Sequence, residues 1–309
     1  MKVFVTGATG FVGREMLLQL RSAGHSIRIL ARDGKSRRAH EVATRHDAEV
    51  HTGNILDRDG LDRGLTGVDA VIHLVGIIAE AGDKTFQNAH TFATENVVAA
   101  TKKAGIRRLV HMSALGTRAN AASRYHQSKW AAEEIVRHSG LDWTIFRPSI
   151  IYGPDDAFVN LFARIARISP VLPVIGQGRA KFQPVPVESV AACFVGALSV
   201  PGSIGKTFDV CGAETFELTE ILDVILSVTG RRRLKLRIPL VLARCQAALL
   251  EFVFPRVFRK APPLNRDQLI MLQEDNVGDA KPAIELFGIK PTSFREGIAR
   301  YLRRNQDVI

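Results

Sequence analysis

The feature that most constrains the fold of this chain is the stretch TGATGFVG at residues 6–13. Its glycines, Gly7, Gly10 and Gly13, follow a short apolar run and precede apolar residues at helical spacing. At the first strand-to-helix turn of a βαβ unit, such glycines permit a tight turn, a close approach of the backbone to a pyrophosphate, and close packing of the helix on the sheet. The helix would then point free N–H groups at the anion. The stretch predicts a phosphate-binding turn, with a turn that serves packing alone as the alternative.

Strand and helix signals alternate through the first half of the chain. Short runs rich in branched residues predict strands over 2–6, 26–31, 48–52, 69–75, 107–113 and 142–148. Apolar residues at helical spacing predict helices over 11–23, 87–104 and 125–138. This alternation predicts an α/β protein with a Rossmann-type, doubly wound parallel sheet covered on both faces.

The second half predicts a smaller, mainly helical C-terminal cap. We expect a nucleotide-binding domain over 1–152, with its sheet and helices completed by 184–212, and a cap region over 153–309. Helices are predicted over 187–198 and 217–229, and a late strand over 206–210. The cap would cover the cleft at the carboxyl ends of the strands, where open α/β sheets bind ligands.

Composition excludes several classes of protein. The net charge is +11, but the basic groups near 32–38 and 231–237 have no interleaved aromatics and no nucleic-acid module is recognisable, so we expect no nucleic-acid partner. Cys193, Cys211 and Cys245 match neither a metal nor a disulfide pattern and are interpreted as small apolar fillers. With no signal-peptide pattern at the first residues and no metal-ligand spacing, we expect a cytoplasmic protein without a metal site.

The residues after the second predicted strand bear on the choice of nucleotide. Asp33 stands near the position of a ribose-binding acid, which favours NAD(H). Arg32 directly follows the strand end at Ala31, and its planar fork suits a 2′-phosphate. We expect NADP(H), with NAD(H) as the alternative; Arg37 and Arg38 are interpreted as solvated surface.

A second group of residues suits proton transfer. Ser113 ends the fifth predicted strand, and Tyr125 and Lys129 lie four residues apart on the next helix. A phenol with a pKa near 10 needs a nearby positive charge to act as an acid or base, and Lys129 would supply it. Ser113 would hold the reacting oxygen by a hydrogen bond. The alternative is that Tyr125 and Lys129 are ordinary helix-surface residues.

These motifs resemble the short-chain dehydrogenase/reductase superfamily, in its extended and atypical branches related to nucleotide-sugar epimerases. The resemblance rests on TGATGFVG (6–13), GNILD (53–57), HLVG (73–76), ENVVAATKKAGIRRLVHMSALG (95–116), YHQSK (125–129) and RPSIIYGP (147–154). It implies that the catalytic residues are Ser113, Tyr125 and Lys129. It implies cofactor contacts by Gly7, Thr9, Gly10, Phe11, Val12, Gly13, Arg32, Asn54, Ile55, Leu74, Val75, Gly76, Tyr125, Lys129, Pro148 and Ile150. Asn54 departs from the family pattern, since many relatives carry an aspartate there.

The second half narrows the resemblance. Residues 154–191, 262–276 and 286–294 look like the NADPH-binding accessory subunit of respiratory complex I and its bacterial relatives. The complex I resemblance implies a cofactor held without turnover and a membrane-associated respiratory complex as partner. Two functions stay open: an NADP(H)-dependent oxidoreductase or epimerase-like enzyme acting on a small carbonyl or alcohol, and a cofactor-stabilised accessory or assembly protein of such a complex or of quinone metabolism.

Three further features have two interpretations each. Arg179, Lys181 and Gln183 would contact substrate or partner, or else are solvated loop residues. The apolar stretch 238–260, flanked by cations, would lie at a membrane interface or a partner, or else pack on its own core. If this stretch lies at a membrane interface, the protein has a peripheral location at the cytoplasmic membrane. His73 and His111, in buried strands, are expected to be satisfied core or cofactor-lining residues.

Overall fold

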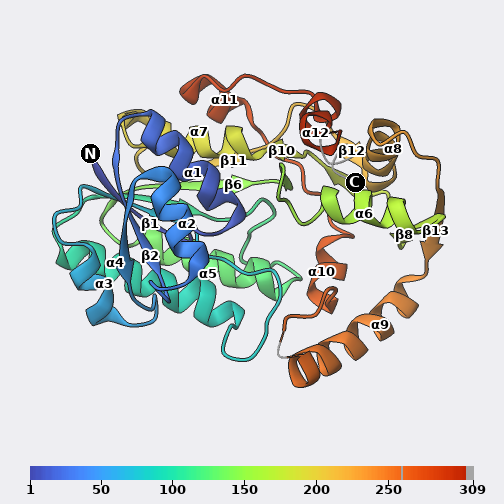
Figure 1. The fold of residues 1–309 in the computed structure, drawn as a ribbon, viewed down its shortest axis with the longest axis horizontal. Coiled ribbons are helices and arrows are strands. Elements are labelled where there is room, and N and C mark those ends of the chain that lie inside the picture. The colour runs from blue at the N-terminus through green and yellow to red at the C-terminus, as the bar shows by residue number, and fades with distance from the viewer. Residues whose placement is uncertain (259, 304–309) are drawn as a thin grey trace.

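A seven-stranded parallel sheet forms the centre of the protein, as the computed structural model, which describes residues 1–258 and 260–303, shows (Figure 1). The strand order is β11-β6-β5-β4-β1-β2-β3, so the chain runs outward in both directions from β1. The strands are β1 (Lys2–Thr6), β2 (Ser26–Ala31), β3 (Ala48–Thr52), β4 (Ala70–His73), β5 (Arg108–Met112), β6 (Asp142–Pro148) and β11 (Lys206–Val210). This order confirms the predicted doubly wound Rossmann-type fold, with the late strand at one edge beside β6.

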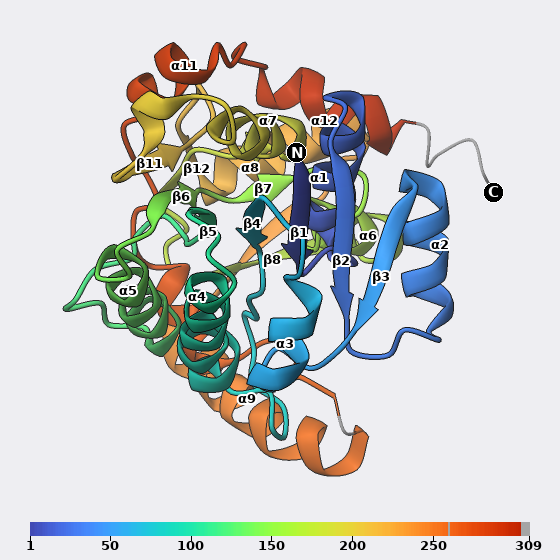
Figure 2. The same ribbon diagram turned by 90° about the vertical axis from the view of Figure 1, so that its left-hand side faces the viewer.

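Helices cover both faces of the sheet because its strands are apolar on both sides (Figure 2). One core joins the sheet to α1 (Phe11–Ser22), α2 (Arg37–His46), α7 (Val187–Ala197) and α11 (Lys281–Phe287). The opposite core joins it to α3 (Arg58–Gly64), α4 (Ala93–Lys103) and α5 (Arg124–Arg137). The segment expected as one helix over 87–104 begins instead with a π-helical turn, η1 (Gln87–Phe92).

A third core lies beyond the carboxyl ends of the strands and forms the cap. Its helices are α6 (Val159–Ile168), α8 (Leu218–Val228) and α12 (Phe294–Leu302). Short strand pairs link them: β7 (Ile151–Tyr152) with β10 (Val185–Pro186), β8 (Val171–Ile175) with β13 (Leu234–Ile238), and β9 (Lys181–Phe182) with β12 (Phe216–Glu217). A short helical turn, η2 (Pro201–Ser203), precedes β11.

The remaining helices form an arm at the edge of the cap. The arm comprises α9 (Leu240–Val253), a π-helical turn η3 (Phe254–Phe258), and α10 (Arg266–Met271), which leads back toward the sheet (Figure 1). Between α9 and α10 the contact is small, centred on Ala243, Ala247 and Leu269. Cys245 lies exposed on α9, so the expectation of a buried filler is wrong for this cysteine and confirmed for Cys193 and Cys211.

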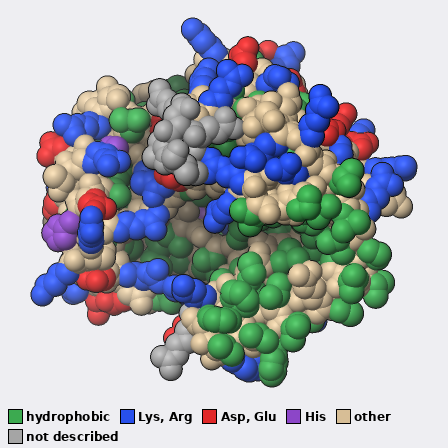
Figure 3. All heavy atoms as spheres, turned by 45° about the vertical axis from the view of Figure 1, so that its right-hand side comes forward, with side chains coloured by type: hydrophobic (Ala, Val, Ile, Leu, Met, Phe, Trp, Pro, Cys, Tyr) green, Lys and Arg blue, Asp and Glu red, His purple; other side chains and the backbone are tan. Residues whose placement is uncertain are grey.

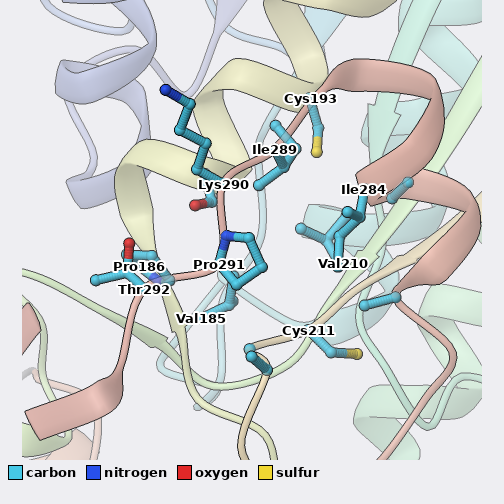
Figure 4. A pocket seen from close by; sticks show the side chains of 15 residues that line it. Val185, Pro186, Cys193, Val210, Cys211, Ile284, Ile289, Lys290, Pro291 and Thr292 are labelled. Carbon is cyan, nitrogen blue, oxygen red and sulfur yellow. The ribbon is translucent and has the colours of Figure 1, made fainter.

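The chain leaves the cap after α10 and returns to the first core, where α11 packs on α7 and β11. Figure 4 shows the seam, in which Ile284 and Ile289 lie close to Cys193 and Val210. The cavity there is about 20 Å³, which is room for a single water. This seam is therefore packing, not a ligand site.

Candidate nucleotide-binding and active site

The glycine turn after β1 has the geometry that a phosphate-binding turn needs. Gly7 adopts a φ of +76°, and its carbonyl accepts the Gly10 N–H at 3.0 Å. A Cβ at Gly13 would lie 2.4 Å from the Gly7 oxygen, so only glycine lets α1 start this close to β1. Thr9, Phe11 and the buried Val12 complete the turn. These contacts pack the turn itself and leave its outer side to a ligand.

The first turn of α1 has unsatisfied backbone donors. Gly10 is the N-cap and supplies no side-chain cap, and no acidic residue lies in the first turn. A helix start of this kind, at the carboxyl end of the central strand, is suited to bind a phosphate.

The next two strand ends carry the residues expected near the ribose and adenine. Arg32 is exposed after β2, and the described residues offer its guanidinium no hydrogen-bond partner. Asp33 uses its carboxylate locally, accepting the Lys35 N–H at 2.9 Å. Asn54, exposed after β3, likewise accepts the Leu56 N–H at 3.1 Å, and its neighbour Ile55 is half-buried. Asp33 and Asn54 therefore both shape turns, whereas Arg32 is free to meet a ligand.

Lys129 lies at the carboxyl ends of the central strands. It is 2% exposed, and its Nζ donates to the Met112 carbonyl of β5 at 3.0 Å. A Cβ at Gly76, just past β4, would lie 3.1 Å from the same nitrogen. Burial lowers the pKa of Lys129 to about 8, although Glu133 acts in the opposite direction. The ammonium is therefore charged near neutral pH and close to the backbone of two strand ends.

Tyr125 lies one turn before Lys129 and is buried among aromatic rings. Phe86, His90 and His126 contact it edge-on, with ring centroids 5.2–5.9 Å away. Burial raises the pKa of Tyr125 to about 12, the opposite direction to the one expected from Lys129 alone. The reason is that Lys129 donates to Met112, while aromatic rings surround the phenol and exclude water. The phenol therefore stays protonated near neutral pH.

Ser113 and the residues after β6 complete this edge of the sheet. Ser113 is buried, and its backbone N–H donates to the Phe146 carbonyl at 2.8 Å. Pro148 accepts the Leu115 N–H at 2.9 Å, which holds the segment leading to Ile150 beside the end of β5. Leu74 and Val75 directly follow β4, and the Leu74 N–H donates to the Thr6 carbonyl of β1.

A hydrogen-bonded chain that the sequence reasoning missed holds the Tyr125 helix in place. The Ile77 N–H donates to His90 Nε2 at 3.0 Å, so the neutral ring carries its proton on Nδ1 and donates it to Ser128 Oγ at 2.8 Å. Ser128 in turn donates to the Tyr125 carbonyl at 2.7 Å. Burial and the nearby Lys129 charge lower the pKa of His90 to about 2. The π-helical turn carries His90, and nothing in the local sequence pattern signals that turn.

The two strand histidines differ from each other. His73 bonds Thr6 at 2.6 Å and Thr94 at 3.2 Å, so it is the satisfied core residue expected. His111 packs on His73, with ring centroids 5.2 Å apart, but neither of its nitrogens has a partner among the described residues. His111 is therefore not a satisfied core residue among the described residues, and its alternative role beside the cofactor stays a prediction.

A cavity of about 170 Å³ lies between this edge of the sheet and the cap. Its walls come from both halves of the chain: the apolar members are Ile78, Ile150, Phe182, Met271 and Leu272, and the polar members are His126, Gln268, Glu274, Asp275 and Asn276. Two buried polar atoms there, His126 Nδ1 and Glu274 Oε2, have no partner among the described residues. Figure 3 shows the hollow between sheet and cap, with Lys and Arg side chains along its left rim.

The three loop residues expected at the cleft lie outside this cavity. The Gln183 side chain accepts the Gly278 N–H at 2.8 Å and so holds a loop of the cap. Lys181 and Arg179 are exposed. Within residues 1–258 and 260–303, no three His, Cys, Asp or Glu side chains are grouped to hold a metal ion, and no helix is long and apolar enough to cross a membrane.

Comparison with known proteins agrees with this geometry. The NAD(P)H-binding family model matches residues 7–168. The chain is 30% identical over 280 residues to a mitochondrial protein of Arabidopsis thaliana, the NADH dehydrogenase [ubiquinone] 1 alpha subcomplex subunit 9, covering 88% of this chain and 70% of the relative. It is 31% identical over 238 residues to a ceramide reductase of Caulobacter vibrioides, covering 77% and 73%.

A solved structure shows the same fold over the full length. The UDP-glucose 4-epimerase of Thermotoga maritima, solved with UDP-glucose, superposes with a TM-score of 0.76 at 19% identity, covering 99% of this chain and 100% of that one. Reductases and complex I subunits thus share this chain's sequence family, and epimerases share its fold. The chain belongs to the NAD(P)H-binding family, together with the complex I subunit 9 proteins.

Proposed function

We propose that the protein is an NADP(H)-dependent reductase of a carbonyl compound with an apolar body. The observation that carries the proposal is the buried ammonium of Lys129, four residues after Tyr125, held at the ends of β4 and β5. A buried cation at this place destabilises the fold unless an anion or a polar ligand binds beside it.

The residues present fit a dinucleotide. The Gly7–Gly13 turn and the free start of α1 would hold the pyrophosphate, with Thr9, Phe11 and Val12 beside it. Asn54 and Ile55 would border the adenine, Leu74 to Gly76 the ribose, and Pro148 and Ile150 the nicotinamide. The bound NADPH would supply a hydride.

The chain's own groups would orient the substrate and move the proton. The Ser113 hydroxyl would hydrogen-bond the carbonyl oxygen and fix its position. Tyr125 would donate its hydroxyl proton to that oxygen, since burial keeps the phenol protonated at neutral pH. Lys129 would stabilise the phenolate left behind, and the His90–Ser128 chain would hold Tyr125 in position.

The substrate class follows from the cavity beside the site. Ile78, Ile150, Phe182, Met271 and Leu272 offer an apolar surface, which favours a ketone with an aliphatic or aromatic body. The ceramide reductase relative bears the name of a lipid substrate, in agreement with this class.

The test replaces the proposed acid. We expect Tyr125→Phe to lower kcat for NADPH-dependent ketone reduction by about 10²–10⁴-fold, because the general acid is lost, while the Kd for NADPH changes less than about twofold. The matched control is Tyr152→Phe, because the Tyr152 hydroxyl is buried with no partner among the described residues. Full activity of Tyr125→Phe would rule out the assigned role.

The preference for NADP(H) has its own test. We expect Arg32→Ala to raise the Kd for NADPH by about tenfold or more and to leave the Kd for NADH nearly unchanged, since only NADPH carries the 2′-phosphate. The exposed neighbour Arg38→Ala is the control. Equal loss for both nucleotides would contradict the assignment.

A second candidate function rests on the relatedness to complex I subunit 9. In that reading the protein is an accessory or assembly factor of a membrane-bound respiratory complex or of quinone metabolism, and the nucleotide stabilises the fold by mass action. Tightly retained NADPH that no ketone or quinone oxidises would favour this function. For either function we place the protein in the cytoplasm, peripheral at the membrane, because eight of its large exposed apolar side chains lie within residues 234–258.

A further inference from the structure

We propose that β13 and α9 form a docking face for the surface of a bilayer that contains anionic lipids. The inference rests on the peripheral location proposed above and names the surface that would make the contact. It does not depend on the reaction at Tyr125. The docking face is defined by six side chains that are 56–75% exposed: Leu234, Leu236, Val241, Leu242, Leu249 and Phe252.

Helix α9 is apolar on both sides, which is unusual for a helix at the edge of a protein. Its inner side buries Ala243 and Ala247 against α10. Its outer side carries Val241, Leu249 and Phe252 at helical spacing, where a surface helix normally carries polar residues. Figure 3 shows this as a broad hydrophobic area at the lower right, over α9. A contiguous area of exposed apolar side chains indicates a binding surface.

The apolar area continues past both ends of α9. Val257 and Phe258 follow in η3 and are 66% and 55% exposed. Leu234 and Leu236 precede it in β13, an edge strand whose side chains are exposed on both faces. Among the described residues, β13 is held by its pairing with β8, and α9 by the small contact with α10.

The charges around the docking face match an anionic surface. Exposed cations flank it at Arg232, Arg256 and Lys260, and the exposed Arg237 lies between its β13 and α9 parts. The acidic residue within 231–260 is Glu251, and it is paired with Arg266 of α10 at 2.7 Å. No unpaired carboxylate of that segment would therefore repel lipid phosphates, and the net charge of +11 would add attraction at longer range.

The form of α9 favours a bilayer over a protein partner. A helix of 14 residues is about 21 Å long, too short to cross a membrane and long enough to lie in its interface. The Arg256 guanidinium lies 4.0 Å from the Phe252 ring centre, which keeps a cation beside an apolar group as at a lipid interface. Apolar side chains between two groups of cations are the arrangement of interfacial helices.

The experiment is co-sedimentation of the full chain with vesicles of phosphatidylcholine alone and of phosphatidylcholine with one quarter phosphatidylglycerol. We expect at least fivefold more bound protein on the anionic vesicles at low salt, and a decrease in high salt. Leu249→Ser/Phe252→Ser should abolish binding, while Leu18→Ser/Ile204→Ser, which removes exposed apolar residues elsewhere, should not. Arg232→Gln/Arg237→Gln should bind several-fold less than the control Lys102→Gln/Lys290→Gln.

The outcomes decide between occupants. The proposal is overturned if wild-type protein sediments with neither kind of vesicle. It is also overturned if the Leu249→Ser/Phe252→Ser variant binds like wild type. A protein partner would then be the occupant of the docking face. Circular dichroism confirms that each variant is folded. Tyr125→Phe should sediment like wild type, so a failed reductase assay and a failed vesicle assay are separate results.

Discussion

At the scale of single residues, Lys129 shows how burial sets the chemistry of the site. Its ammonium has lost most of its water, so the pKa decreases to about 8 although Glu133 and the Met112 carbonyl favour the charged form. Burial instead raises the pKa of the neighbouring Tyr125 to about 12, because it favours the neutral form of a phenol. Burial therefore keeps the acid protonated and the cation only just charged.

The first prediction concerns the stability of the fold against pH. The folded pKa of Lys129 lies below its ordinary value of 10.5, so the unfolded chain binds more protons between pH 8 and 10 and folding stability should rise with pH in that window. The cost of the buried charge, about 3 kcal/mol, is fully present below pH 8. We expect urea titrations at pH 7.5, 8.5 and 9.5 to show this rise for wild type and not for Lys129→Met. Parallel curves would contradict the assignment.

The second prediction concerns the glycine turn. Gly13→Ala would place a Cβ 2.4 Å from the Gly7 oxygen, so the turn must open and we expect NADPH binding to weaken by at least tenfold. The control is Gly202→Ala, whose Cβ would meet Leu286 at an ordinary 3.5 Å. NADPH fluorescence titration measures both. A Gly13→Ala variant with wild-type affinity would show that the turn does not hold the nucleotide.

At the scale of elements, α5 is held to the sheet by more than apolar packing. Glu133 is fully buried and pairs with Arg147 of β6 at 2.6 Å and with Arg137 at 2.5 Å. At the other end of the helix, Asp267 of α10 accepts the Arg124 and Tyr125 N–H groups at 2.7 and 3.0 Å. The helix that carries Tyr125 and Lys129 is thus fixed at both ends.

The third prediction tests the buried ion pairs. We expect Glu133→Ala to lower the free energy of unfolding by about 3 kcal/mol, because two arginines lose their buried partner. Glu134→Ala removes a neighbouring pair with Arg137 that is partly exposed, and should cost less than about 1 kcal/mol. Urea denaturation gives both values; equal losses would mean that Glu133 is not the anchor of α5.

These elements also show how far the sequence predicts the site. The strands, the glycine turn and the pair of Tyr125 and Lys129 are each predicted by a pattern within about twenty residues. The structure places the glycine turn and this pair at the carboxyl ends of the strands. His90 was missed, because its role depends on a π-helical turn and on Ser128, 38 residues away. The pKa direction of Tyr125 was also wrong, because it depends on which rings surround the phenol.

At the scale of the whole molecule, one loop joins the cap to the sheet. Asn276 accepts the Ser149 hydroxyl at 2.6 Å, donates to the Leu115 carbonyl at 3.1 Å and, through its backbone, donates to Lys181 at 2.7 Å. The same loop leads from α10, a wall of the cavity between sheet and cap, back to α11 on the first core. It therefore couples the cavity to the ends of β5 and β6.

The fourth prediction concerns the side-chain hydrogen bonds of Asn276. Asn276→Ala removes two side-chain hydrogen bonds, and we expect a loss of about 2 kcal/mol in the local opening free energy, equivalent to about thirtyfold faster amide exchange over 262–280. Hydrogen exchange by mass spectrometry measures this, with the exposed Gln177→Ala as control. Unchanged exchange would mean that the cap is held by its apolar core alone.

The sequence by itself determined the Rossmann sheet and its glycine turn, because periodicity and glycine spacing act within one strand, turn and helix. Only the tertiary structure decided which side chains meet across the chain: Asn276 with Ser149 over 127 residues, and Asp267 with Tyr125 over 142. It also decided that α9 packs inward through its two buried alanines and presents its larger apolar side chains outward. The physical reason is that hydrogen bonds and burial between distant segments depend on how the second half folds back over the first, and no local pattern encodes that path.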